Sequence, residues 1–245
     1  MSAVTVENKG AISIIRINRP ERLNAIDQEV AVGLQKAFKA FDADDSKRVA
    51  ILSSTGDKAF SSGADVSNLP ELWRCIPTAG YDTEKPIVAA TTGWVIGGAI
   101  VMTMMCDLMV STESTLFYYP EAKLGTTAGG ISSLVSRMPH KLAMEIMLLG
   151  SKVPAQRAYD VGFVNRVVPN GTHETAALEM AETLLDSAPL VIGALKRLAA
   201  QVTPVGPIER MVGISQTIAR VRQSEDMQEG IAAFKEKRKP NFKAR

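Results

Sequence analysis

The stretch that most constrains the fold is residues 87–106, which contain no charged side chain. Its first part, residues 87–91, is rich in β-branched residues and predicts a short buried strand. Residues 98–105 predict a helix that is buried on all sides, because they leave no polar stripe. Between these elements lie Gly97 and Gly98. A glycine pair where a helix begins lets backbone N–H groups approach a ligand, with the positive end of the helix dipole behind them.

Taken by itself, this stretch also fits two structural interpretations. An uncharged run of this length is compatible with a membrane-spanning helix, although glycines and threonines interrupt it. It is also compatible with a buried strand, turn and helix that pack closely and bind nothing. The rest of the chain has to decide between these interpretations and a binding site.

Composition favours an ordinary globular protein in a reducing, cytoplasmic setting. The chain has 245 residues and a formal net charge of +2, which favours no class of charged partner. Cys75 and Cys106 make neither a disulfide framework nor a zinc spacing, and the N-terminus lacks a signal pattern. His140 and His173 lie at expected helix starts in polar surroundings, so we interpret them as surface residues.

Strand and helix patterns divide the chain into two parts. Strand–strand–helix units recur up to about residue 170, which predicts an α/β fold with a largely parallel sheet buried on both faces. The chain is expected to be helical afterwards, and such helices need a further surface, for which a neighbouring subunit is the simplest candidate. We therefore expect an α/β core over residues 1–172 and a helical oligomerisation region over residues 173–245. The expected strands are 4–7, 11–18, 48–53, 87–91, 108–111, 115–118 and 164–168, and the expected helices are 27–41, 98–105, one opening at 131, 140–149, 154–160, 174–187, 189–201, 207–222 and 224–235.

Two loops present small residues after expected strands, residues 62–64 and the pair Gly97 and Gly98. Sites in parallel sheets form beyond the carboxyl ends of neighbouring strands. Two backbone N–H groups that converge there can hold an oxygen that gains negative charge, as in an enolate or a tetrahedral intermediate. Removing one such donor typically costs about 10²–10³ in rate.

The order and wording of several segments resemble the enoyl-CoA hydratase/isomerase (crotonase) family over nearly the whole chain. The matching segments are residues 22–25, 59–65, 85–90, 97–98, 104–107, 120–125, 142–145, 158–168 and 229–238. The resemblance implies a crotonase-like spiral of strand–strand–helix units with a C-terminal helical trimerisation region. It also implies a homotrimer or a dimer of trimers that acts on an acyl-CoA thioester. It implies no cofactor beyond the coenzyme A of the substrate, no metal, no nucleic acid and no membrane.

The resemblance carries individual roles onto matching positions. The N–H groups of Ala64 and Gly98 would form the oxyanion hole for the thioester carbonyl, and Lys237 would meet the coenzyme A phosphates of an adjacent subunit. The other positions along the coenzyme A moiety would be Arg22, Ala25, Ala64, Asp65, Val66 and Gly98.

One position departs from the hydratases of this family, which use two glutamates. The second of these falls on Glu121, but the first, three residues after the oxyanion glycine, is Val101. Valine transfers no proton, so the two-carboxylate mechanism has lost one member. A single base suffices to move a proton from C2 to C4 of a 3-enoyl thioester, and the resemblance therefore favours an isomerase with Glu121 as its acid/base. Hydration by an altered mechanism and acyl-CoA binding without turnover remain alternatives, and the short segment after Asp65 suggests an altered acyl pocket.

Overall fold

Two sheets form the centre of the molecule in the computed structural model, which describes residues 2–245 apart from the side chains of residues 215, 216 and 219. The larger sheet has the order β1-β2-β3-β5-β7-β10 and is parallel except for the β1–β2 hairpin. Its strands are β1 (Val4–Lys9), β2 (Ile12–Ile17), β3 (Val49–Ser54), β5 (Ile87–Thr91), β7 (Leu108–Thr112) and β10 (Arg166–Val168). The smaller sheet has the order β4-β6-β8-β9. Its strands are β4 (Ala59–Ser61), β6 (Trp94–Ile96), β8 (Leu116–Tyr118) and β9 (Val153–Pro154).

The larger sheet is buried on both faces, as expected. Alternate residues point to opposite faces of a strand. Ile14, Ile51 and Val88 belong to the apolar cluster under α6 (His173–Leu185). Their neighbours Ile15 and Leu52 belong to the main core, together with residues of α1 (Gln28–Ala43) and α2 (Gly98–Met104).

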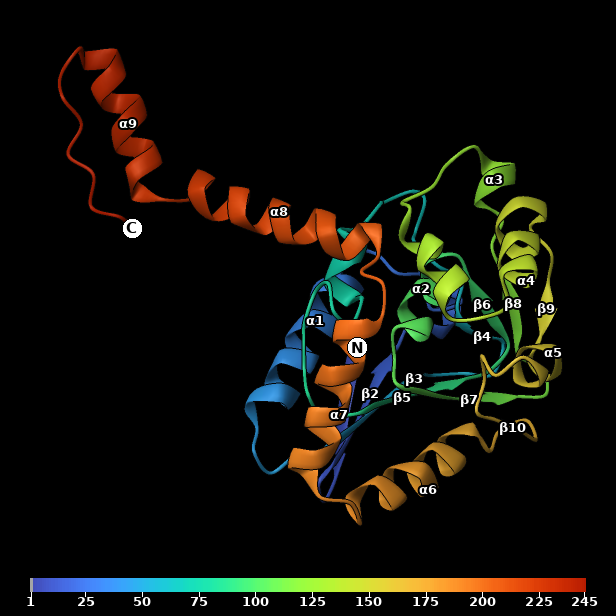
Figure 1. Cartoon of the computed structure of the whole chain (residues 1–245). Coiled ribbons are helices and arrows are strands. Elements are labelled where there is room, and N and C mark those ends of the chain that lie inside the picture. Colours follow the sequence, from blue (N-terminus) through green and yellow to red (C-terminus); the bar gives the residue numbers. More distant parts are fainter. Residues whose placement is uncertain (1) are drawn as a thin grey trace.

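Repeated units build both sheets at once. In each unit the first strand enters the larger sheet and the second enters the smaller one: β3 and β4, then β5 and β6, then β7 and β8. Successive units step along by one strand in each sheet, and α2 and α3 (Glu121–Leu124) follow the second and third units. This spiral arrangement confirms the recurring strand–strand–helix units (Figure 1).

Several expected elements differ in detail. The sequence pattern missed β4, β6 and β9, which have two or three residues and show no periodicity of their own, although the equally short β8 and β10 fall within expected strands. The helix expected to open at residue 131 is the 3₁₀ helix η3 (Gly130–Ser136), and α4 (His140–Met144) continues as a π-helical turn over Glu145–Leu149. The expected connection after residue 65 contains a 3₁₀ turn, η2 (Leu72–Cys75). The α/β part of the chain also contains α5 (Ala155–Asp160) and the short 3₁₀ helix η1 (Pro20–Arg22).

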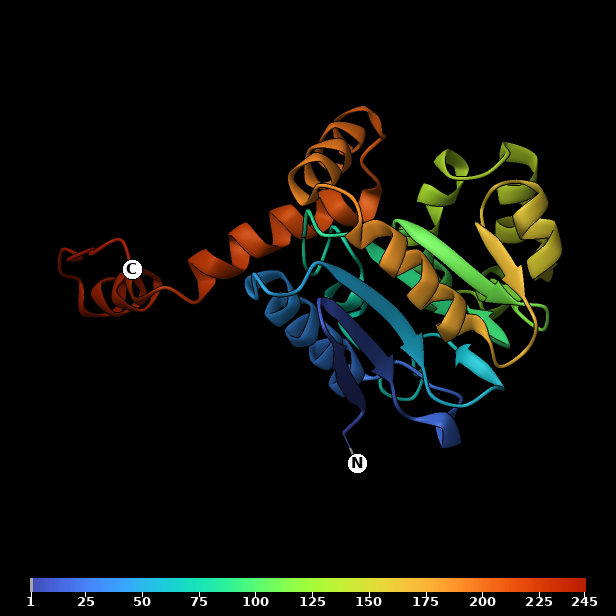
Figure 2. The ribbon, with the colours of Figure 1, turned by 90° about the horizontal axis from the view of Figure 1, so that it is seen from below.

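Three long helices end the chain: α7 (Pro189–Val202), α8 (Pro207–Arg222) and α9 (Glu225–Glu236). α7 lies against the body of the molecule, whereas α8 leads outward from it and carries α9 at its far end, as both views show (Figures 1 and 2). Across residues 2–245, no helix has the length and apolar character needed to span a membrane.

Candidate active site

The predicted site residues follow three adjacent parallel strands of the smaller sheet. Ala64 lies just after β4, Gly98 directly follows Gly97 after β6, and Glu121 lies just after β8. Parallel neighbours end at the same edge, so the three strand ends bring these residues to one place. The loops had been expected to follow strands 48–53 and 87–91 of the main sheet. Both follow short strands of the second sheet instead.

Backbone contacts fix the relative positions of these strand ends. The Gly97 N–H donates to the Tyr118 carbonyl at 3.0 Å, which ties the end of β6 to the end of β8. The backbone of Gly63 approaches that of Gly98 so closely that a Cβ at Gly63 would lie 3.5 Å from the Gly98 nitrogen. Gly63 has a φ of +86°, a conformation that suits glycine. The two candidate oxyanion loops are therefore immediate neighbours.

Neither candidate N–H group has a hydrogen-bond acceptor within the described chain. Beside Ala64, the Ile26 N–H donates to the Gly63 carbonyl at 2.8 Å and the Ile26 carbonyl accepts from Asp65 at 2.8 Å, so the pairing leaves the Ala64 N–H unused. Gly98 is the first residue of α2, where a helix gives its N–H groups no internal partner. Both donors are available to an oxygen of a ligand.

Asn24 holds the preceding loop beside this edge. Its side chain, in a residue that is only 1% exposed, donates to the carbonyls of Thr55 and Ala59 at 2.9 Å each and accepts from the Arg19 N–H at 2.9 Å. Its φ is +54°, which asparagine tolerates better than most residues. Arg19 adds an ion pair of 2.8 Å to Asp27, the N-cap of α1. Asn24 lies in the matching segment 22–25, but the sequence alone assigns it no role.

Glu121 lies half-buried at the start of α3, with its carboxylate against Gly97. A Cβ at Gly97, where φ is +57°, would collide with Oε1 of Glu121. The other oxygen, Oε2, is buried and has no hydrogen-bond partner within the described chain. Burial raises the pKa of the Glu121 carboxyl to about 7, against an opposing effect of its own backbone N–H. A carboxyl with such a pKa can accept and return a proton near neutral pH.

The space beside Glu121 is apolar on the α2 side. Val101 lies on α2 four residues after the N-cap Gly97, and a helical side chain at this spacing leans back toward the Gly97 turn. Val101 is 4% exposed and packs against Gly130, where a Cβ would lie 3.0 Å from a Val101 methyl and 3.4 Å from a methyl of Ile208. Leu72 covers Gly98 in the same way, with a methyl 2.6 Å from the position of a Cβ.

The residues predicted along coenzyme A are only partly brought together. Ala25 and Asp65 are partly exposed and Val66 is 77% exposed, all on the paired segments 23–26 and 62–65 or directly after them. Arg22 is exposed, and its charge, with that of Arg19, adds to the Ser67 hydrogen bonds that lower the pKa of Asp65. Lys237 instead caps the far end of α9, away from the other predicted residues of the same chain (Figure 1).

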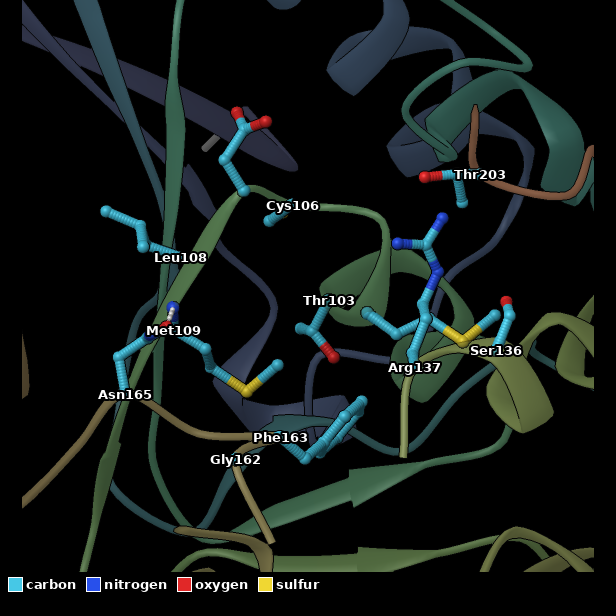
Figure 3. A pocket seen from close by; sticks show the side chains of 12 residues that line it. Thr103, Cys106, Leu108, Met109, Ser136, Arg137, Gly162, Phe163, Asn165 and Thr203 are labelled. Atoms are coloured by element: carbon cyan, nitrogen blue, oxygen red, sulfur yellow. Dashed lines mark hydrogen bonds between the residues drawn. The ribbon is translucent and has the colours of Figure 1, made fainter. Parts of the chain in front are cut away.

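A cavity of about 260 Å³ lies at the opposite end of α2 (Figure 3). It is lined by Thr103 of α2, by Cys106 just after this helix, by Phe163, and by Arg137, whose side chain extends toward Thr203. The seven residues of α2 span about 10 Å, so this cavity and the predicted site are separated by the length of the helix. The cavity contains none of the predicted site residues.

Other reactive side chains stay outside the predicted site. Both cysteines are free, and burial raises the pKa of Cys75 to about 12, so that thiol is protonated at neutral pH. His140 is exposed as expected, but His173 is half-buried and burial lowers its pKa, which corrects its interpretation as a surface residue. Within residues 2–245, no three His, Cys, Asp or Glu side chains gather to hold a metal ion.

Comparisons with known proteins give the same family over nearly the full length of the chain. A model of the enoyl-CoA hydratase/isomerase family matches residues 7–245. A carnitinyl-CoA dehydratase of Salmonella typhi is 35% identical over 252 residues, covering 96% of each chain. The crystal structure of a carnitinyl-CoA hydratase from Mycobacterium avium superposes with a TM-score of 0.78 at 33% identity, covering 100% of both chains. An enoyl-CoA hydratase from Mycobacterium tuberculosis superposes with a TM-score of 0.76 at 31% identity, again over 100% of both chains.

Proposed function

Because the chain belongs to the enoyl-CoA hydratase/isomerase family, we propose that this enzyme isomerises 3-enoyl-CoA thioesters to 2-enoyl-CoA thioesters. In this proposal the thioester carbonyl accepts from the N–H groups of Ala64 and Gly98. The Glu121 carboxylate removes a proton from C2, and the negative charge spreads from C2 over the carbonyl oxygen and C4. Glu121 then returns the proton to C4, the double bond moves between C2 and C3, and no atom is gained or lost.

The observation that carries this proposal is that a carboxylate stands at position 121 while an apolar valine stands at position 101. Glu121 lies against Gly97 with an unused carboxylate oxygen, while the face of α2 one turn further on carries a valine packed on Gly130. A proton shift needs one base that also serves as the acid, whereas the two-carboxylate hydration needs a second group to hold water. A pKa of about 7 suits a group that must both take and give a proton.

Coenzyme A and subunit contacts complete the proposal. We place the coenzyme A moiety along Arg22, Ala25 and the segment 64–66, beside the free N–H groups. Its phosphates would meet Lys237 of an adjacent subunit, because the position of α9 removes this residue from its own chain's site. The assembly would be a homotrimer or a dimer of trimers.

The deciding experiment is Glu121→Gln, assayed by the appearance of the conjugated 2-enoyl chromophore from 3-enoyl-CoA. We expect a loss of about 10²–10⁴ in kcat, the usual contribution of a positioned acid/base. Binding of a saturated acyl-CoA should change little, because glutamine has nearly the same shape. The exposed Glu113→Gln is the matched control and should keep wild-type turnover. Unchanged turnover in Glu121→Gln would remove this carboxyl from the mechanism.

A second candidate is dehydration of a 3-hydroxyacyl-CoA or its reverse, the hydration of a 2-enoyl-CoA. It is supported by the relatives named carnitinyl-CoA dehydratase and enoyl-CoA hydratase. Glu121 would then act on the water alone or with a group other than Val101. The wild-type enzyme separates the candidates: loss of the conjugated chromophore of crotonyl-CoA at a rate that exceeds isomerisation of 3-enoyl-CoA would favour the dehydratase.

A further inference from the structure

The first turn of α8 belongs to the core, unlike the rest of that helix. Ile208 and Val212 are each 4% exposed and join the main apolar cluster, whereas Met211, Ile214 and Ile218 on the same helix are 55%, 64% and 46% exposed. The N-terminal end of α8 is thus docked on the body, and the remainder extends away from it (Figure 2).

Polar contacts fix this first turn at a defined position. The Glu209 carboxylate accepts from the Gly206 N–H at 2.5 Å, which caps the helix start. The same carboxylate accepts from the Thr78 hydroxyl at 2.8 Å, which joins α8 to the segment after η2. Gly206 lies against Ser133 of η3, so closely that a Cβ there would collide with the serine hydroxyl. The local cap and two segments of the body therefore set where the side chain of Ile208 lies.

Ile208 and Val101 both lie against Gly130. A Cβ at Gly130 would lie 3.0 Å from Val101 and 3.4 Å from Ile208, so the missing side chain of this glycine leaves room for both residues. Val101 in turn leans toward the Gly97 turn, where the carboxylate of Glu121 lies. Ile208 thus supports, from behind, the apolar wall that faces the acid/base.

We propose that Ile208 determines the reaction specificity of this site, by keeping the space beside Val101 filled and free of water. Hydration adds a hydroxyl group to C3 and a proton to C2 of a 2-enoyl thioester, and it therefore needs an ordered water molecule near that carbon. An ordered water needs two to four polar partners, and an apolar site without them stays dry. With Ile208 in place, Glu121 has only the substrate to exchange protons with. The inference deepens the proposed isomerase function and rests on it.

The experiment compares two reactions in one enzyme. Ile208→Ser opens space and adds a hydroxyl that can hold a water, so we expect the rate ratio of crotonyl-CoA hydration to 3-enoyl-CoA isomerisation to rise about tenfold or more. Val212→Ser is the matched control, because Val212 has the same burial one turn along α8. A merely structural role for Ile208 would lower both rates together and leave the ratio at the value of the control.

The outcomes separate the two proposals. If the wild-type enzyme forms no 2-enoyl-CoA from 3-enoyl-CoA, the proposed function fails and this inference fails with it. If the wild type isomerises but the ratio in Ile208→Ser equals that in Val212→Ser, the inference alone is overturned. Should Ile208→Ser not fold, Ile208→Thr keeps most of the volume, adds the hydroxyl and is expected to shift the ratio in the same direction.

Discussion

At the scale of single residues, Gly97 is the position where the backbone meets the carboxylate of Glu121, the proposed acid/base. Its φ of +57° favours glycine, and its missing side chain leaves room for Oε1 of Glu121. Its N–H also fixes the end of β6 to the end of β8. One residue therefore sets both the place of the carboxylate and the start of the helix that offers the Gly98 N–H.

Gly97→Ala should therefore damage catalysis more than folding. The added methyl displaces the Glu121 carboxylate, and a misplacement of about 1 Å can cost about 10² in rate, so we expect kcat to fall by about that factor with a smaller change in KM. Gly10→Ala is the control, because it has the same φ of +57° and a Cβ there meets nothing within 4 Å. Equal effects of the two variants on kcat would show that backbone strain alone explains the loss.

The raised pKa of Glu121 predicts the pH dependence. Only the ionised carboxylate removes a proton, so kcat/KM should fall about tenfold per pH unit below a pKa of about 7. The contribution of Glu121 to the stability of the folded state changes with pH in the opposite direction. Because the folded-state pKa lies above the ordinary 4.5, the group favours the folded state below pH 4.5 and loses this contribution as the pH rises through about 7. A pH–rate profile that stays flat from pH 5 to 8 would contradict the assignment.

The sequence identified these chemical groups only in part. Glu121, Ala64 and Gly98 could be named because they sit in segments that resemble a known family, and the structure gathers them at one sheet edge. The anchoring role of Asn24 and the packing of Ile208 on Gly130 could not be predicted. Both depend on contacts between residues more than 30 positions apart, about which a local pattern says nothing.

At the scale of elements, short strands position the site. The central strands β2, β3, β5 and β7 of the main sheet were predicted well, since four to six buried residues in each give a clear apolar pattern. Strands β4 and β6 have three residues each, too few for a period, and they escaped prediction. The site lies at the ends of these short strands. Its residues could therefore be named from the sequence, but the second sheet that positions them could not be predicted.

We expect Asn24 to be the residue that contributes most to holding the segment 19–27 in place. Asn24→Ala removes two donors from the carbonyls of Thr55 and Ala59 and one acceptor from Arg19. Losing buried hydrogen bonds of this kind costs about 1–3 kcal/mol, measurable as a lower urea midpoint. Asn68→Ala, at an exposed position, should stay within about 0.5 kcal/mol of the wild type. An unchanged midpoint in Asn24→Ala would show that the loop is held by other contacts.

At the scale of the whole molecule, the last three helices carry apolar stripes that their own chain leaves exposed. Residues spaced by three and four lie on one face of a helix. The exposed stripes are Val191, Leu195, Leu198 and Val202 on α7, Met211, Ile214, Ile218 and Val221 on α8, and Met227, Ile231 and Phe234 on α9. Contiguous apolar surface of this kind marks a protein interface. The division at residue 172 and the assembly remain predictions, supported by these stripes.

Ile214→Glu should shift the protein toward monomers. It puts a charge in the middle of the α8 stripe, where burial in an interface would be costly. Gly213→Glu is the control, since it adds the same charge next to it, on another face of the helix and with nothing within 4 Å. Sedimentation velocity is the measurement. A wild-type mass equal to one chain of 26.3 kDa would contradict the expected assembly.

The two ends of helix α8 have different surroundings, although they belong to one continuous helix. Its start packs in the core, where Ile208 lies against Gly130 beside Val101, and its free length presents the apolar stripe that another copy would cover. A second subunit that binds the exposed part of α8 would also restrict the movement of the first turn, which carries Ile208. Separating the subunits by dilution would then also loosen the packing of Ile208. The isolated subunit would select less strictly between isomerisation and hydration than the assembled enzyme.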